Sequence, residues 1–179
     1  MTKDAILDNY KRVLSQQRFA LEGLFSSSVS AIEKSNQRPR LGDWSKDIVQ
    51  AFHESAVTAY ASQIYAGCLF LVLDRWIQSL ARDFELNVEE RLDAGELIGK
   101  TPLSRLIWAT ANNFRHYKEW NQKNTNSQSS MQALNKAGIP DDYLKDICAM
   151  DVLILIKPTT YANLEEKVLD IADKLRAKS

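Results

Sequence analysis

Helix-breaking residues and cysteines are scarce in this chain of 179 residues, which holds 6 Gly, 4 Pro and 2 Cys. So few breakers favour long helices over a fold made of many strands and turns. Two cysteines give no disulfide framework, so we expect a protein of the reducing cytoplasm. The sequence also lacks a glycine-rich phosphate loop and a metal-ligand cluster, and we therefore expect no metal and no cofactor.

The chain also lacks a net charge at pH 7, because it has 23 Lys plus Arg and 23 Asp plus Glu. A neutral chain has no overall positive field, so contact with nucleic acid needs a local basic patch. Neutrality also makes self-association easier. The N-terminus lacks the apolar stretch of a signal peptide, and the apolar run from Tyr65 to Leu73 is too short to span a bilayer. We expect that run to be a core helix with Cys68 buried in it, and no contact with a membrane.

Apolar residues recur at three- and four-residue steps along most of the chain, which predicts an all-α helical bundle. Helices are predicted at about 3–34, 44–84, 88–92, 102–122, 130–137, 141–150 and 161–177. The first two are very long, and no substantial sheet is expected. The stretch 124–129 is polar and irregular, and 151–156 fits either a helix or extended packing. The length suits one domain over 1–179, with a bundle core at about 2–123 and C-terminal helices at about 130–178.

The most unusual surface belongs to the predicted helix that begins near Pro102, where Thr101 can cap and Pro suits the first helical position. At about 100° per residue its apolar and polar side chains fall on opposite faces. The predicted core face holds Leu103, Leu106, Ile107, Phe114 and Tyr117. The polar stripe holds Arg105, Asn112, His116 and Glu119, with Trp108 and Trp120 on its two sides and Arg115 beside Trp108.

Two interpretations of this polar stripe stay open. A polar line opposite an apolar stripe is the ordinary solvent face of an amphipathic helix. Solvent faces rarely carry two large aromatic side chains, however. A polar line between Trp108 and Trp120 therefore also fits a surface that another subunit or a ligand covers.

The same helix carries a family resemblance. The string from Ala111 to Trp120 reads Ala-Asn-Asn-Phe-Arg-His-Tyr-Lys-Glu-Trp, and it resembles the signature helix of HEPN domains. Those helical-bundle domains are commonly dimeric, and many are metal-independent ribonucleases of toxin–antitoxin and phage-defence systems. Their motif is an Arg, usually followed by Asn or Asp, with a His four to six residues after the Arg. Asn112 and His116 match the polar residue and the His, and the pattern Asn-x-x-Arg-His-x-x-Glu-Trp resembles a bacterial branch of such proteins.

The chain departs from the motif at one place, because Ala111 stands where the family has its Arg. In such a ribonuclease the Arg stabilises the charge on the scissile phosphate and the His moves a proton. Either Arg105, Arg115 or an Arg of a second subunit takes that role here, or the domain binds RNA without cleaving it. The resemblance covers this helix and a general likeness in helix order over about the first 125 residues.

The resemblance implies a HEPN-like helical bundle and an RNA-directed protein, either a metal-independent ribonuclease of a toxin–antitoxin or phage-defence system or a binding relative. Whether the chain is an enzyme stays open. The expected catalytic residues are His116, Asn112 and Arg115, and the expected binding residues are Arg105, Glu119, Trp108 and Trp120. The expected partners are a second copy of the chain, RNA and a cognate antitoxin protein. The alternative is a non-catalytic helical module for protein interaction or dimerisation.

Overall fold

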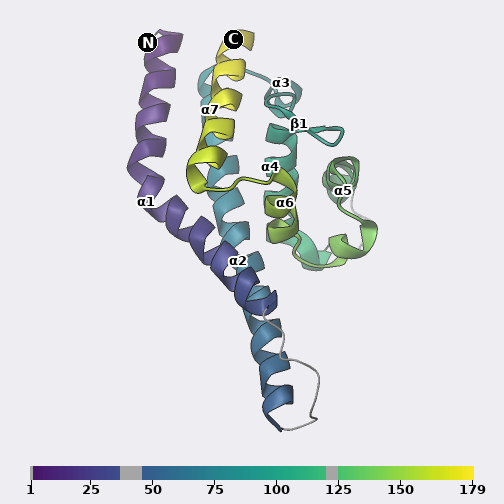
Figure 1. The fold of residues 1–179 in the computed structure, drawn as a ribbon. Coiled ribbons are helices and arrows are strands. Elements are labelled where there is room, and N and C mark those ends of the chain that lie inside the picture. Colours follow the sequence, from purple (N-terminus) through teal and green to yellow (C-terminus); the bar gives the residue numbers. More distant parts are fainter. Residues whose placement is uncertain (1, 37–45, 120–124) are drawn as a thin grey trace.

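The computed structural model describes residues 2–36, 46–119 and 125–179 (Figure 1). Its helices are α1 (Lys3–Asn36), α2 (Lys46–Asp83), α3 (Val88–Leu92), α4 (Leu103–His116), α5 (Thr125–Ala137), α6 (Ala149–Ile156) and α7 (Tyr161–Lys178). Two 3-10 turns cover Tyr117–Glu119 and Asp141–Lys145, and β1 (Leu97–Ile98) pairs antiparallel with β2 (Thr101–Pro102). The predicted all-α architecture with two very long N-terminal helices is confirmed.

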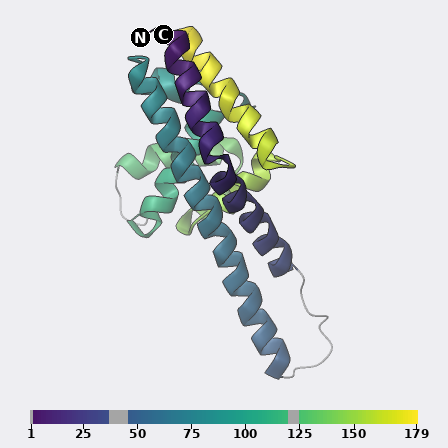
Figure 2. The same ribbon diagram turned by 90° about the vertical axis from the view of Figure 1, so that its left-hand side faces the viewer.

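The two long helices, α1 and α2, run side by side and form the backbone of the molecule (Figures 1 and 2). Leu7, Leu14 and Leu21 are buried at a seven-residue spacing, so one stripe of α1 packs along its neighbours. The Trp76 Nε1–H of α2 donates to the Tyr10 carbonyl of α1 at 3.1 Å. The far end of the pair projects beyond the other helices (Figure 2).

The last helix, α7, lies alongside α1 and brings the two chain ends together (Figure 1). Ion pairs join the two helices, with 2.9 Å between Lys11 and Asp173 and 2.6 Å between Arg176 and Asp4. Leu164, Val168, Ile171 and Leu175 are buried and lie along one stripe of α7.

The predicted signature helix, α4, is the central helix of the fold and contacts α2, α3, α5, α6 and α7. The predicted core face is confirmed, because Leu103, Leu106 and Ile107 are fully buried. Phe114 and Tyr117 are half-buried and pack against the same core. Burial reaches well beyond the predicted face, however, since α4 is enclosed by helices on most of its sides.

A close approach fixes where α2 and α4 cross. A Cβ added at Gly67 of α2 would lie 2.2 Å from Cδ2 of Phe114, so the aromatic ring packs directly on the glycine backbone. The small β1–β2 hairpin has a similar constraint at its tip. Gly99 has φ of +60°, and a Cβ there would lie 2.6 Å from the Ala137 carbonyl of α5.

Several predicted boundaries differ from the structure. Helix α5 begins at Thr125 rather than at about 130, so residues 125–129 of the expected irregular stretch are helical. The expected helix over 141–150 is a 3-10 turn at Asp141–Lys145 followed by α6, and the ambiguous stretch 151–156 is helical. Helix α4 ends at His116 rather than near 122; residues 120–122 lie outside the described residues.

Helix α2 combines a core position with an unusual share of exposed apolar surface. Ala66, Leu69, Phe70 and Leu73 are buried, which confirms the expected core segment, whereas Cys68 is only half-buried. Within the described part of the chain one helical segment, Phe52–Asp83, is long and apolar enough to cross a membrane by length and composition. This segment is longer than the apolar run from Tyr65 to Leu73 that the sequence analysis judged too short. Its most apolar 18-residue window has mean hydropathy 1.6 and is 33% buried, and the core helices of soluble proteins pass the same test.

Candidate functional site on helix α4

The polar stripe of α4 is placed unevenly with respect to solvent. His116 is exposed at the last position of the helix, and Arg105 and Asn112 are half-buried. Trp108 is half-buried against the core rather than standing on an open surface. Glu119 ends the 3-10 turn that continues α4, and Trp120 lies outside the described residues.

Arg115 is anchored by a buried carboxylate of α2. Its Nη2–H donates to Asp74 Oδ2 at 2.9 Å, and the Asp74 side chain is only 2% exposed. The Gln78 amide donates to the same oxygen at 2.9 Å. A buried carboxylate needs such donors, because removal from water without partners would cost several kcal/mol. The guanidinium of Arg115 is therefore held in one place relative to α2.

Asn112 extends this network to α5. Its Oδ1 accepts a hydrogen bond from Arg115 Nη1 at 3.0 Å, and its Nδ2 donates to the Ser130 hydroxyl at 3.2 Å. Ser130 is fully buried. The chain Asp74–Arg115–Asn112–Ser130 thus joins three helices through one continuous set of hydrogen bonds, and it places two of the predicted catalytic residues in direct contact.

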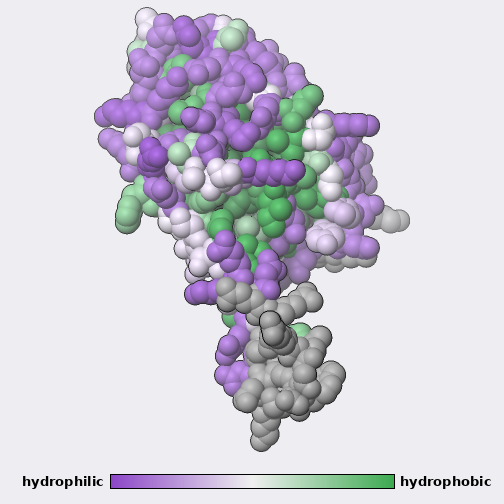
Figure 3. Space-filling model, in the orientation of Figure 1, coloured by the Kyte–Doolittle hydropathy of each residue, from purple (hydrophilic) through white to green (hydrophobic). Residues whose placement is uncertain are grey.

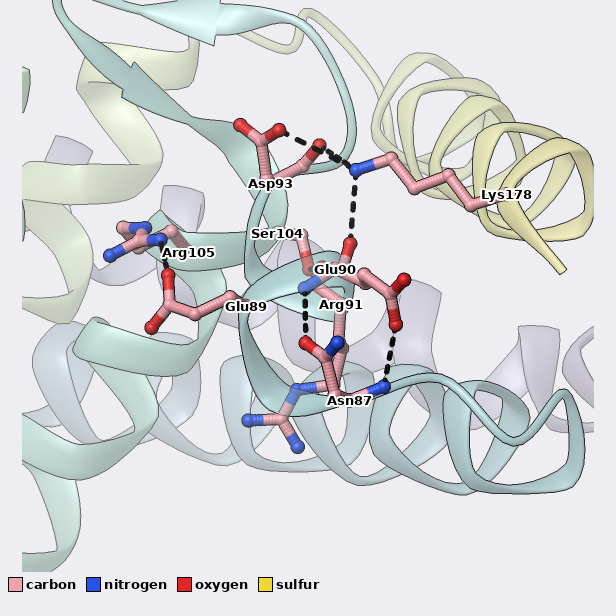
Figure 4. Close-up of polar contacts among 8 residues, drawn as sticks. All are labelled: Asn87, Glu89, Glu90, Arg91, Asp93, Ser104, Arg105 and Lys178. Atoms are coloured by element: carbon pink, nitrogen blue, oxygen red, sulfur yellow. Dashed lines mark hydrogen bonds and ion pairs between the residues drawn. The ribbon is translucent and has the colours of Figure 1, made fainter.

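Arg105 lies in a separate group of contacts near the start of α4 (Figure 4). Its Nη2 lies 2.6 Å from Oε2 of Glu89, a residue of α3 whose side chain is 77% exposed. A pair of this kind contributes little to stability and is easily exchanged for another anion. The structure therefore brings Asn112 and Arg115 together, while Arg105 belongs to the α3 end of the site.

Arg91 is a cation that the sequence analysis did not select. It lies on α3 and is half-buried, and in Figure 4 its guanidinium points toward the helices below α3 without a drawn partner. Burial lowers the pKa of Arg91, and the charge of Asp74 opposes that shift. Asp74 thus acts on both Arg91 and Arg115, two cations against one carboxylate.

Asn113 is another residue that the sequence analysis missed. It is fully buried; its Nδ2 donates to the Asp146 carbonyl at 3.0 Å, and its Oδ1 accepts from the Cys148 backbone N–H at 3.0 Å. This side chain fastens the segment before α6 onto α4. Both hydrogen bonds join α4 to the segment before α6, so Asn113 has a structural role, whereas Asn112 contacts Arg115.

Ala111, where the resemblance leads us to expect an Arg, is fully buried. A guanidinium there would have to displace packed core atoms. Of the two arginines near Asp74, Arg115 contacts its carboxylate directly and Arg91 feels its charge.

Among the described residues no group of three or more His, Cys, Asp and Glu side chains is arranged to hold a metal ion. Comparison of the chain with models of known protein families, with curated proteins and with solved structures found no match.

Proposed function

We propose that this chain is an RNA-directed protein whose contact surface is the C-terminal end of α4. The observation that carries the proposal is the anchored guanidinium of Arg115, held by Asp74 and Asn112 and adjacent in sequence to the exposed His116. An arginine fixed in this way loses little freedom when it meets a phosphate, which is how phosphate sites are preorganised.

Arg115 keeps binding capacity beyond its internal contacts. A guanidinium has five N–H donors, and the structure engages Nη2 with Asp74 and Nη1 with Asn112. The side chain remains 34% exposed. Arg91 and the exchangeable Arg105 add positive charge toward α3. The three arginines outnumber their carboxylate partners Asp74 and Glu89 by one, and we propose that this local excess of positive charge lets a neutral chain contact nucleic acid.

The proposed chemistry is metal-independent cleavage. His116 would take the proton of a ribose 2′-hydroxyl, whose oxygen attacks the adjacent phosphorus, while the P–O5′ bond breaks and the leaving oxygen receives a proton. Arg115 would stabilise the charge on the phosphate. A second copy of the chain would supply the second histidine, and a cognate antitoxin protein would cover the site.

The histidines allow a matched test, because the chain has only two and His53 is an exposed residue of α2. Expression of the wild type from a tight promoter should arrest growth, and His116→Ala should abolish the arrest, whereas His53→Ala should leave it unchanged. Cellular RNA extracted after induction should show new cleavage products only where growth stops. Equal growth and intact RNA in all three strains would refute the nuclease form of the proposal.

A second candidate function, a non-catalytic helical interaction module, is favoured by one observation. No charged residue occurs from Ser55 to Leu73 of α2, yet Val57, Tyr60 and Tyr65 of this stretch are exposed, at 67%, 49% and 40%. Exposed apolar surface of that kind marks protein contacts. If the purified protein neither binds nor cleaves RNA but captures a partner that Tyr60→Ser releases, this second function is supported instead.

A further inference from the structure

A groove of 510 Å³ lies between the N-terminal half of α1 and the C-terminal half of α2, helices that run side by side in Figure 2. None of the predicted site residues of α4 lines it. Its apolar residues are Val13, Leu71, Val72 and Trp76, and its polar residues are Asn9, Tyr10, Gln17, Arg75, Ser79 and Asp83. The volume falls in the range of sites for small molecules, which are typically apolar with a few polar groups at their rim.

One end of the groove is closed by internal hydrogen bonds. The Tyr10 hydroxyl donates to Asp83 Oδ2 at 2.7 Å, and Trp76 Nε1–H donates to the Tyr10 carbonyl at 3.1 Å. Burial, followed by the hydrogen bond to Asp83, raises the pKa of Tyr10 to about 12. Because these groups hydrogen-bond to one another, a ligand at this end of the groove would mainly meet the apolar wall formed by the Trp76 ring.

The other polar side chains of the groove are available. Within the part of the chain that the structure describes, Arg75, Gln17 and Ser79 make no side-chain hydrogen bond, and Arg75 forms no ion pair. Arg75 and Ser79 lie four residues apart on α2 and so project from the same side of the helix. An uncommitted guanidinium therefore borders an apolar wall, with two further hydrogen-bonding side chains in the same groove.

We propose that this groove binds a small organic carboxylate with a flat apolar body. The planar fork of the Arg75 guanidinium matches a carboxylate in a bidentate pair. The apolar body would then lie along Val13, Val72 and Trp76. Asp83 disfavours a second anionic group at the far end, about 12 Å along the helix from Arg75 at 1.5 Å per residue, so the ligand carries its single negative charge at one end.

Titration calorimetry with 2-naphthoate tests this assignment, and 2-naphthalenemethanol serves as the uncharged ligand of the same shape. The wild type should bind 2-naphthoate and bind the alcohol much more weakly. Arg75→Gln should weaken naphthoate binding at least about tenfold, because it removes a charge-assisted pair. Arg176→Gln makes the same charge change on α7, at an exposed ion pair with Asp4 outside the groove, and it should leave the affinity within about twofold.

A second variant tests the groove itself. Val13→Trp fills the space between the helices and should abolish binding while the circular dichroism spectrum stays helical. The assignment is overturned if the wild type does not bind 2-naphthoate, if Arg75→Gln binds as tightly as Arg176→Gln, or if the alcohol binds as well as the acid. Because Arg75 is exposed, its substitution does not endanger the fold, and the comparison of the two Gln variants remains decisive if Val13→Trp does not fold.

Discussion

Replacing Asp74 with Asn would show whether a buried carboxylate holds the arginine of α4 in place. Asp74 is 2% exposed and accepts hydrogen bonds from Arg115 and Gln78, each at 2.9 Å. Asn keeps the size but removes the charge and turns one acceptor into a donor. Removing one partner of a fully buried ion pair costs about 3–5 kcal/mol. Arg115 is 34% exposed and can regain hydration, so we expect a loss of about 2 kcal/mol.

The chain offers a control with the same geometry and a different burial. Lys11 and Asp173 are also 2.9 Å apart, but the Asp173 side chain is 55% exposed. In thermal unfolding Asp74→Asn should lower Tm by about 4–8 °C, since 1 kcal/mol corresponds to about 2–4 °C in a chain of this length. Asp173→Asn should cost no more than about 0.5 kcal/mol, or about 2 °C.

A double-mutant cycle separates the ion pair from other effects of the substitution. Arg115→Gln combined with Asp74→Asn should lose clearly less stability than the sum of the single variants, because each single change leaves one charge without its partner. If Asp74→Asn has the same Tm as Asp173→Asn, or if the two single effects simply add, Asp74 does not anchor Arg115 and the description of the site is wrong.

Three further outcomes follow from the packing. Gly67→Ala should lose about 1–3 kcal/mol, because its Cβ would lie 2.2 Å from Phe114, and Phe114→Leu in the same chain should restore part of that loss in urea unfolding. Asn113→Leu should cost about 2–3 kcal/mol by leaving buried backbone groups unpaired, whereas an unchanged urea midpoint would contradict its role. Burial raises the pKa of Cys148 from 9.0 to about 12 and that of Tyr10 from 10.0 to about 12, so both groups stay protonated in the folded protein at a pH where they ionise in the unfolded chain. Tm should therefore hold below pH about 9 and fall as the pH rises toward 12. A Tm that is flat or rising above pH about 9 would contradict this.

The long helices were predictable because their signal is local. Leu7, Leu14 and Leu21 repeat along α1 with a spacing that no strand would produce. The start of α5 was not predictable in this way. Ser127 and Ser130 are buried, so small hydroxyl side chains form the inner face at the start of α5, ahead of the buried Ala133 and Leu134. A hydrophobic pattern does not register these serines.

The break before α6 depends on a contact that is distant in sequence. Gln63 of α2 accepts a hydrogen bond from the Met150 N–H at 2.7 Å and donates to Asp151 at 2.8 Å. These bonds satisfy groups at the start of α6, where the Cys148 side chain provides no cap. A pattern of neighbouring residues does not reveal a partner that is distant in sequence. The sequence therefore predicted a single helix across 141–150.

The candidate site was predictable only in part, because its residues on α4 show a local pattern whereas their partners lie on other helices. The sequence selected Asn112 and Arg115 from one helix without pairing them, and the structure joins the two side chains by a 3.0 Å hydrogen bond. A helical wheel describes one helix alone, so it could not show that Asp74 and Ser130 from α2 and α5 meet this pair. It also could not select Arg91, whose relation to the site comes from the packing of α3.

The affinity of the purified protein for single-stranded RNA tests the central claim most directly. Fluorescence anisotropy of a labelled oligonucleotide should show salt-dependent binding by the wild type. Arg115→Gln and Arg91→Gln should each weaken it and reduce the slope of log affinity against log salt by about one, whereas Arg75→Gln, the same change at the α1–α2 groove, should bind as the wild type does. An absence of binding, or an equal loss in all three variants, would contradict the assignment of RNA contact to α4.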